Sequence, residues 1–258
     1  PREGDMILVC RMMERITVKN QVKNARFFGH ADNEEPADYV VSALAELGLL
    51  NSRLGMEKNS LFLTARISES LQNKTPDVEW HDSSNLVSAL RLVKSPLEME
   101  YVRKAAIAAD AGMLAAIEAI HEGASDYEIS AECTRAMILA GSEYPGFGPF
   151  IRPSSRLGEE HTTWRGETFR NGDAVFLEIA AAYRKYQAPM GRLVYVGRAP
   201  KDVNISVQLA IDGMNAIHKA LKPGAKAGDS YSAWREVARK GGLEGYERHH
   251  CGYLVSIG

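Results

Sequence analysis

The sequence predicts an α/β protein in two parts, a small α/β domain over residues 1–90 and a larger α+β domain over residues 91–258. Three observations support this fold class. Short apolar strand patterns alternate with helical ones up to about residue 90, two capped helices follow, and strand-like runs separated by turn residues dominate residues 147–196. The 258 residues are 45% hydrophobic and 25% charged, a composition typical of a globular protein.

The first part is expected to contain alternating short strands and helices. Residues 37–50 carry apolar side chains at helical spacing and approach a break at Gly48, so they are predicted to be a helix. A second helix is expected around residues 68–73. The predicted strands are 6–9 (continuing over 12–18), 53–62 and 78–81.

The second part opens with two helices. Ser95 can cap a helix with Pro96 at its first position and Glu98 three residues after the cap, which predicts a helix to about residue 120. Asp126 is expected to cap the next helix, which Gly141 ends. A turn is predicted at 171–173, strands at 147–151, 174–183 and 192–196, and further helices at 207–221 and 230–240.

Charge and cysteine content exclude several function classes. The net charge is −2, from 31 basic and 33 acidic residues, so neither nucleic acid nor an anionic membrane surface is an expected partner. The longest apolar runs are shorter than the roughly 18–20 residues of a bilayer span, so no membrane association is expected. Cys10, Cys133 and Cys251 show no C-x-x-C spacing, which favours a reducing, cytoplasmic compartment. Because the chain starts at Pro1 and stops directly after an apolar run, we expect a fragment of a longer protein.

One carboxylate and three histidines are the candidates for chemistry. Glu178 lies within the apolar run AVFLEIAAAY, where an ionised carboxylate needs a polar cavity, a specific partner or a strand edge with its head in solvent. His161 lies in a polar loop, and His249 and His250 precede the apolar residues 253–255. Histidine titrates near neutral pH and suits proton transfer or metal binding, the alternatives being a surface loop and a solvated turn.

The order of four segments resembles the pita-bread family, which includes aminopeptidase P, prolidase, methionine aminopeptidase and creatinase. The segments are KSPLEMEYVRKAA, the histidine loop, NGDAVFLEIAAAYRKYQAPMGRLVYVG and HHCGYLVSIG. The resemblance implies a curved antiparallel sheet covered by helices over residues 91–258, truncated at its C-terminal end. It also implies a partial creatinase/prolidase-like domain over residues 1–90, and a homodimer in which the small domain of one chain closes the other's site.

The resemblance also bears on metal binding. The family's metallopeptidases hold two metal ions with two aspartates, a histidine and two glutamates. The three positions that fall within this sequence are Glu178, Pro189 and Tyr253, with His249 at the other histidine of the family's H-x-x-x-H motif. Proline has no ligating side-chain atom, so no metal and no other cofactor is expected.

Loss of the metal ligands with retention of histidines is the pattern of creatinase, which hydrolyses a C–N bond beside a cationic, amidine-like carbon. The sequence departs from creatinase at Glu178, where creatinase has an uncharged residue, and at Gly191, where it has a glutamate. In these features it looks most like the ectoine hydrolases, which open a cyclic amidine to N-acetyl-diaminobutyrate. The alternatives are a metal-dependent Xaa-Pro peptidase, a creatinase-type amidinohydrolase and a non-catalytic relative.

This resemblance implies a small-molecule substrate and a set of roles. Glu178 would pair with the amidinium and act as nucleophile or orient a water, His161 would transfer protons, and His249 would stabilise the reacting centre. The residues implied to bind substrate are Arg192, for a carboxylate, Tyr253 and Trp164.

Overall fold

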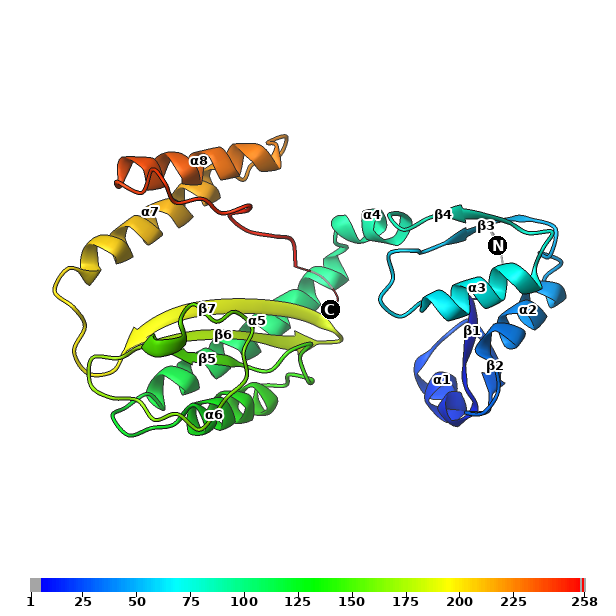
Figure 1. Cartoon of the computed structure of the whole chain (residues 1–258), viewed down its shortest axis with the longest axis horizontal. Helices are drawn as coiled ribbons and strands as arrows, with labels where there is room; N and C mark the ends of the chain where they lie inside the picture. The colour runs from blue at the N-terminus through cyan, green and yellow to red at the C-terminus, as the bar shows by residue number, and fades with distance from the viewer. Residues whose placement is uncertain (1–5, 256, 258) are drawn as a thin grey trace. The chain divides into compact units, whose positions relative to one another are not determined.

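The computed structural model describes residues 6–255 and 257 (Figure 1). The chain forms two compact units, Pro1–Arg91 and Leu92–Gly258, here called unit 1 and unit 2. Within the described residues, no helix is both long enough and apolar enough to cross a membrane.

Unit 1 combines two parallel strand pairs with helices. Strand β1 pairs with β2, and β3 pairs with β4. A small core forms between the elements around Ala37, Met56 and Leu71. The elements in chain order are β1 (Met6–Arg11), a 3-10 turn (Met12–Glu14), α1 (Arg15–Gln21), β2 (Ala25–His30), α2 (Pro36–Glu46), β3 (Arg53–Met56), α3 (Ala65–Lys74), β4 (Glu79–Asp82) and α4 (Leu86–Leu92).

The predicted continuation of the first strand over residues 12–18 is wrong. That segment is the 3-10 turn followed by α1, and it joins two strands that run parallel, β1 and β2. Two adjacent parallel strands must be joined by a crossover connection. A continuation of β1 as a strand could not provide that connection. Strand β3 is also shorter than the predicted 53–62, because a turn closes at once when the amide of Lys58 donates to the carbonyl of Met56.

Unit 2 contains a three-stranded antiparallel sheet with two helices, α5 (Pro96–Glu118) and α6 (Asp126–Leu139), covering one face (Figure 1). Its strands are β5 (Phe150–Pro153), β6 (Ala174–Tyr183) and β7 (Tyr186–Tyr195). The main core lies between these helices and the sheet. At Gly112 of α5, a Cβ atom would lie 2.4 Å from Cγ of Met137, so only glycine allows this approach of the two helices.

Of the two predicted helix caps in unit 2, one is confirmed and the other is wrong. Ser95 forms a full capping box with Glu98 at the start of α5, as predicted. The cap of α6 is Ser125, in a second capping box with Glu128, rather than Asp126. Asp126 is fully buried and turns its carboxylate towards the loop at residues 156–166 instead, which leaves the capping role to the preceding serine.

Strand alternation places Glu178 on the face of the sheet that α5 and α6 do not cover. Val175, Leu177 and Ile179 belong to the main core, so Phe176 and Glu178 point to the opposite face. Strand β6 has the predicted bounds. Strand β7 begins at Tyr186, six residues before the predicted start, because a tight turn with positive φ at Arg184 and Lys185 joins it directly to β6.

Helices α7 (Val203–Ala220) and α8 (Ala227–Lys240) pack against each other, and both begin a few residues before their predicted starts. The segment after α8 runs back towards the sheet, where Ile257 bridges to Tyr186 at the start of β7 (Figure 1). This return brings the C-terminal histidines to the face of the sheet that carries Glu178.

Candidate functional site

A cavity of about 850 Å³ lies on this face of the sheet and is called the site cavity below. Its walls come from all three strands, from the loop after β5 and from the C-terminal segment. The lining residues are Arg152, Leu157, Glu160, His161, Phe176, Glu178, Pro189, Met190, Gly191, Leu193, Arg248, His249, His250 and Tyr253. A space of this size suits a small molecule rather than a folded partner.

Glu178 has both a polar cavity and a cationic partner. Its side chain is 26% exposed, and its Oε2 lies 3.9 Å from Nη2 of Arg152, whose side chain is only 5% exposed. The guanidinium of Arg152 and the carboxylate of Glu178 line the same cavity. The sequence left three surroundings open for Glu178. The structure excludes one of them, the strand edge with the carboxylate in solvent.

Arg152 is held in place on two sides. Its Nη1 donates to the carbonyl of Glu159 at 2.5 Å and lies 3.3 Å from the carboxylate of Glu160. Its guanidinium carbon lies 4.5 Å from the centroid of the Phe176 ring, a cation–π contact. The arginine is thus fixed beside Glu178 by the loop above it and the ring beneath it.

The loop that carries His161 is anchored by a buried ion pair. The carboxylate of Asp126 accepts the amides of Arg165 and Gly166, both at 2.9 Å, and lies 3.2 Å from Nη2 of Arg156. Arg156, itself 4% exposed, also lies 2.8 Å from Glu167. These contacts fix the loop at Arg156 and at residues 165–167, on either side of His161.

His161 projects from this loop over the sheet. Its backbone has φ +43°, in the left-handed region that a non-glycine residue seldom adopts. Its ring centroid lies 5.3 Å from that of Phe150, the residue directly opposite Glu178 in the sheet. The imidazole is therefore brought to the wall of the cavity that contains the carboxylate.

The C-terminal histidines form a small aromatic group. The rings of His249 and His250 lie perpendicular with centroids 4.4 Å apart, and His250 lies 5.9 Å from Tyr253. The hydroxyl of Tyr231 on α8 donates to the carbonyl of Arg248 at 2.6 Å, which ties this segment to the helix pair.

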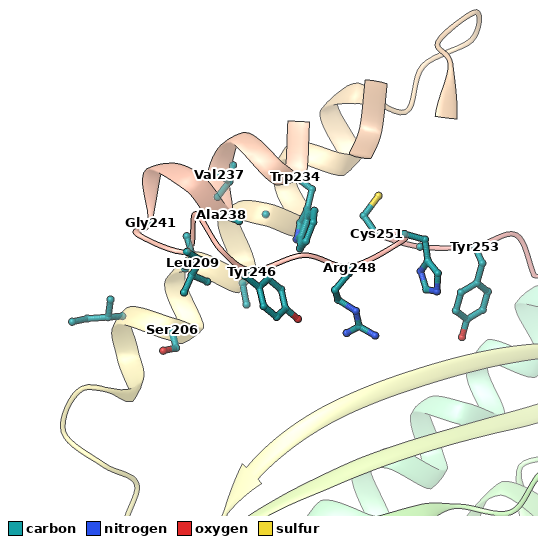
Figure 2. Close-up of a pocket in the computed structure, with 16 residues that line it drawn as sticks. Ser206, Leu209, Trp234, Val237, Ala238, Gly241, Tyr246, Arg248, Cys251 and Tyr253 are labelled. Atoms are coloured by element: carbon teal, nitrogen blue, oxygen red, sulfur yellow. The ribbon is translucent and has the colours of Figure 1, made fainter. Parts of the chain in front are cut away.

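Helices α7 and α8 and the same segment enclose a second, mainly apolar space of about 580 Å³ (Figure 2). Figure 2 shows Arg248 and Tyr253 projecting from the segment towards the sheet, while Cys251 projects to the other side. Leu209, Trp234 and other apolar side chains line this space. Arg248, His250 and Tyr253 line both spaces, whereas Glu178, His161 and His249 line the site cavity and not the second space.

Four of the six residues expected to act in the site line the site cavity: His161, Glu178, His249 and Tyr253. Trp164 and Arg192 do not. The indole of Trp164 donates to the carbonyl of Pro149 at 2.6 Å and packs against the main core, which gives it a structural role.

Arg192, expected to contact the substrate, lies outside the site cavity. It pairs with Leu177, so its side chain leaves the face of β7 opposite to the one that carries Glu178, and it is exposed. Its Nη1 donates to the carbonyl of the neighbouring Gly191 at 2.7 Å. The cavity's buried arginine is Arg152, which the sequence analysis missed; the signal was a charged residue within the short apolar strand FIRP.

The donor set does not fit a metal centre at the positions that the family resemblance suggested. Glu178 and Pro189 share one face, Pro189 lying opposite Ala180, so the only side-chain donor of the two is one carboxylate. Across residues 6–255 and 257, no group of three or more His, Cys, Asp or Glu side chains could hold a metal ion.

Comparisons with known proteins agree with this architecture. An ectoine hydrolase of Halomonas elongata is 31% identical over 234 residues, covering 86% of this chain and 58% of that protein. An Xaa-Pro dipeptidase of Pyrococcus furiosus is 27% identical over 195 residues, covering 76% of this chain and 56% of that protein. The chain therefore spans less than three-fifths of the length of these two relatives.

Solved structures share the fold. A prolidase from Thermococcus sibiricus superposes with a TM-score of 0.85 at 21% identity, over 100% of this chain and 69% of that one. An X-Pro aminopeptidase from Thermotoga maritima gives 0.83 at 18% identity, over 99% and 71%. These likenesses confirm the pita-bread fold predicted from the sequence. Residues 1–93 match the creatinase/prolidase N-terminal domain and residues 100–258 match metallopeptidase family M24, so the chain belongs to that family.

Proposed function

We propose that the protein hydrolyses a C–N bond in a small, cationic amidine-type substrate, and that ectoine is this substrate. The observation that carries the proposal is the pairing of Glu178 with the buried Arg152 in a cavity that also contains His161 and His249. The relative named ectoine hydrolase supports the same reaction. The cavity offers a negative group for the amidinium and histidines for the proton transfers.

Ring opening consumes one water and breaks one ring C–N bond. Oxygen adds to the amidine carbon, a proton passes to the leaving ring nitrogen, and the C–N bond breaks to give an amide and a free amine. Glu178 supplies the oxygen nucleophile directly or orients the attacking water, and His161 removes and returns the proton. Proton transfer by a positioned side chain contributes about 10²- to 10⁴-fold to the rate.

The first experiment measures ectoine hydrolysis by NMR with the full-length protein, in the presence and absence of a chelator. Glu178→Gln keeps the size of the side chain and removes its charge, so kcat is expected to fall by about 100-fold or more. Glu132→Gln, on the exposed surface of α6, is the matched control and should keep the wild-type rate. Undiminished ring opening by the Glu178→Gln variant would contradict the proposal.

A single turnover in H₂¹⁸O separates the two routes. If Glu178 is the nucleophile and water attacks the glutamyl carbonyl carbon of the covalent intermediate, ¹⁸O enters the glutamate, where peptide mass spectrometry detects it, and a glutamate oxygen passes to the product amide. If Glu178 orients the water, the label appears in the product amide alone.

The second candidate function is cleavage of Xaa-Pro peptides, which the names of several relatives favour. Peptidase activity in this family would need a metal centre, and Pro189 removes a ligand position from it. Metal-dependent cleavage of an Xaa-Pro dipeptide, with no turnover of ectoine, would establish this alternative and refute the first.

A further inference from the structure

We propose that Arg152 binds the carboxylate of the substrate, through the edge of its guanidinium formed by Nε and Nη2. This inference rests on the proposed function and deepens it. It assigns to a buried residue of β5 the role that the sequence analysis gave to Arg192.

The hydrogen-bond donors of Arg152 are unequally used. Nη1 donates to the carbonyl of Glu159 and approaches that of Leu157 at 3.5 Å. Nη2 lies 3.9 Å from Glu178, beyond hydrogen-bond distance, and Nε is buried with no acceptor among the described residues. Because Nε–H and the nearer Nη2–H point to the same side, the unused donors form one planar fork, the geometry that binds a carboxylate with two parallel hydrogen bonds.

The fork is both rigid and desolvated. The Arg152 side chain is 5% exposed, its guanidinium lies against Phe176, and Nη1 is fixed by the loop. A buried N–H without an acceptor is rare in folded proteins, because it has lost water without gaining a partner. Since Arg152 lines the site cavity, a ligand oxygen can supply the missing acceptor.

The charges of Glu178 and Arg152 also match those of a zwitterion. In a cyclic amidine that carries a carboxylate on a carbon next to a ring nitrogen, the two charged groups are only a few bonds apart. The cavity presents a carboxylate and a guanidinium 3.9 Å apart, so the amidinium can bind Glu178 while the substrate carboxylate binds Arg152. Each charge then lies beside an opposite one, which favours the zwitterion over a ring without the acid group.

The other arginine that lines the cavity is a weaker candidate. Arg248 is exposed and projects from the C-terminal segment. An exposed, long side chain loses conformational freedom on binding and competes with water, whereas Arg152 is already ordered.

The test compares two substrates in the full-length protein: ectoine and 2-methyl-1,4,5,6-tetrahydropyrimidine, which is the same ring without the carboxylate. The readout is the ratio of their kcat/KM values, followed by NMR. Arg152→Gln and Arg152→Lys are compared with the wild type, and Arg135→Gln on the exposed surface of α6 is the control. Circular dichroism confirms that each variant is folded.

We expect the wild type to prefer ectoine, and Arg152→Gln to reduce that preference by about 10- to 100-fold through KM for ectoine, because a charged hydrogen-bonded pair is lost. Arg152→Lys keeps the charge without the fork. Its preference for ectoine should fall between those of the wild type and Arg152→Gln. An equal loss for both substrates would overturn the proposal and make Arg152 a positioning residue for Glu178. No loss for either would also overturn it. Failure of the wild type to open either ring would instead refute the proposed function itself.

Discussion

Replacement of Asp126 by alanine should unfold the histidine loop and destabilise unit 2. The buried carboxylate accepts two backbone amides and the guanidinium of Arg156. Alanine leaves all three donors without this acceptor and leaves the buried Arg156 with Glu167 at 2.8 Å and Glu159 at 3.8 Å as its carboxylate partners. Removing one partner of a buried ion pair typically costs about 3–5 kcal/mol, because the remaining charge stays out of water.

The expected loss is therefore about 3–5 kcal/mol for Asp126→Ala. For Asp126→Asn it is about 1–3 kcal/mol, because the amide keeps one acceptor oxygen but presents its NH₂ group to a donor. Urea unfolding followed by circular dichroism measures the free energy. Hydrogen exchange of residues 162–167 tests the local effect, since the amides of Arg165 and Gly166 should exchange faster. Asp110→Asn, at an exposed position on α5, is the control and should change stability by less than about 0.5 kcal/mol.

A loss below about 1 kcal/mol for Asp126→Ala, with unchanged exchange in the loop, would refute this reasoning. It would show that Arg156 and Glu167 hold the loop without the aspartate. Under the proposed function, ring opening should also fall in Asp126→Ala even where the protein remains folded, because the loop carries His161.

Two other groups give predictions from their pKa values. Hydrogen bonds from the backbone amide and hydroxyl of Ser95, and from the hydroxyl of Tyr186, lower the pKa of Glu98 from its ordinary 4.5 to about 2. The contribution of Glu98 to stability is complete above pH 4.5 and is lost as the pH falls towards 2. In Glu98→Gln, the free energy of unfolding measured with urea should therefore depend less on pH between 4.5 and 2. An unchanged pH dependence would contradict this. Burial raises the pKa of the Cys133 thiol to about 12, so iodoacetamide at pH 8 should label the partly exposed Cys251 and leave Cys133 unlabelled until the protein unfolds; rapid native labelling of Cys133 would contradict this.

The parts of the fold that could be predicted from the sequence are those set by local rules. Strand β6 follows from its continuous apolar run, and the capping box at Ser95 and Glu98 lies within four residues of sequence. Strand β2 was not predicted, because ARFFGH contains a charged residue and a glycine and becomes a strand through its parallel pairing with β1. Non-local pairing of this kind leaves little trace in a single segment.

The candidate site shows the same division. A cavity position for Glu178 was one of three alternatives from the sequence, because an ionised carboxylate within an apolar strand needs a polar surrounding. Its partner could not, because Arg152 reaches it only through the register of β5 on β6, in which Arg152 lies opposite Phe176. The face on which Arg192 lies likewise depends on its pairing with Leu177, and a shift of one residue would have turned it into the cavity.

The same face of the sheet supports the proposed reaction without a metal centre. Glu178 and Pro189 lie on neighbouring strands where the family resemblance places two metal-binding aspartates. Of these two positions only Glu178 carries a carboxylate, and its cationic partner is Arg152 from β5. A guanidinium cannot generate hydroxide as a metal does, so in the proposed reaction the attack on the substrate begins from a carboxylate or a histidine. Such attack suits an amidinium, whose carbon is already activated by its own charge, better than a neutral peptide bond. The proline at the second ligand position and the proposed cationic substrate can therefore be traced to the same change in the sheet.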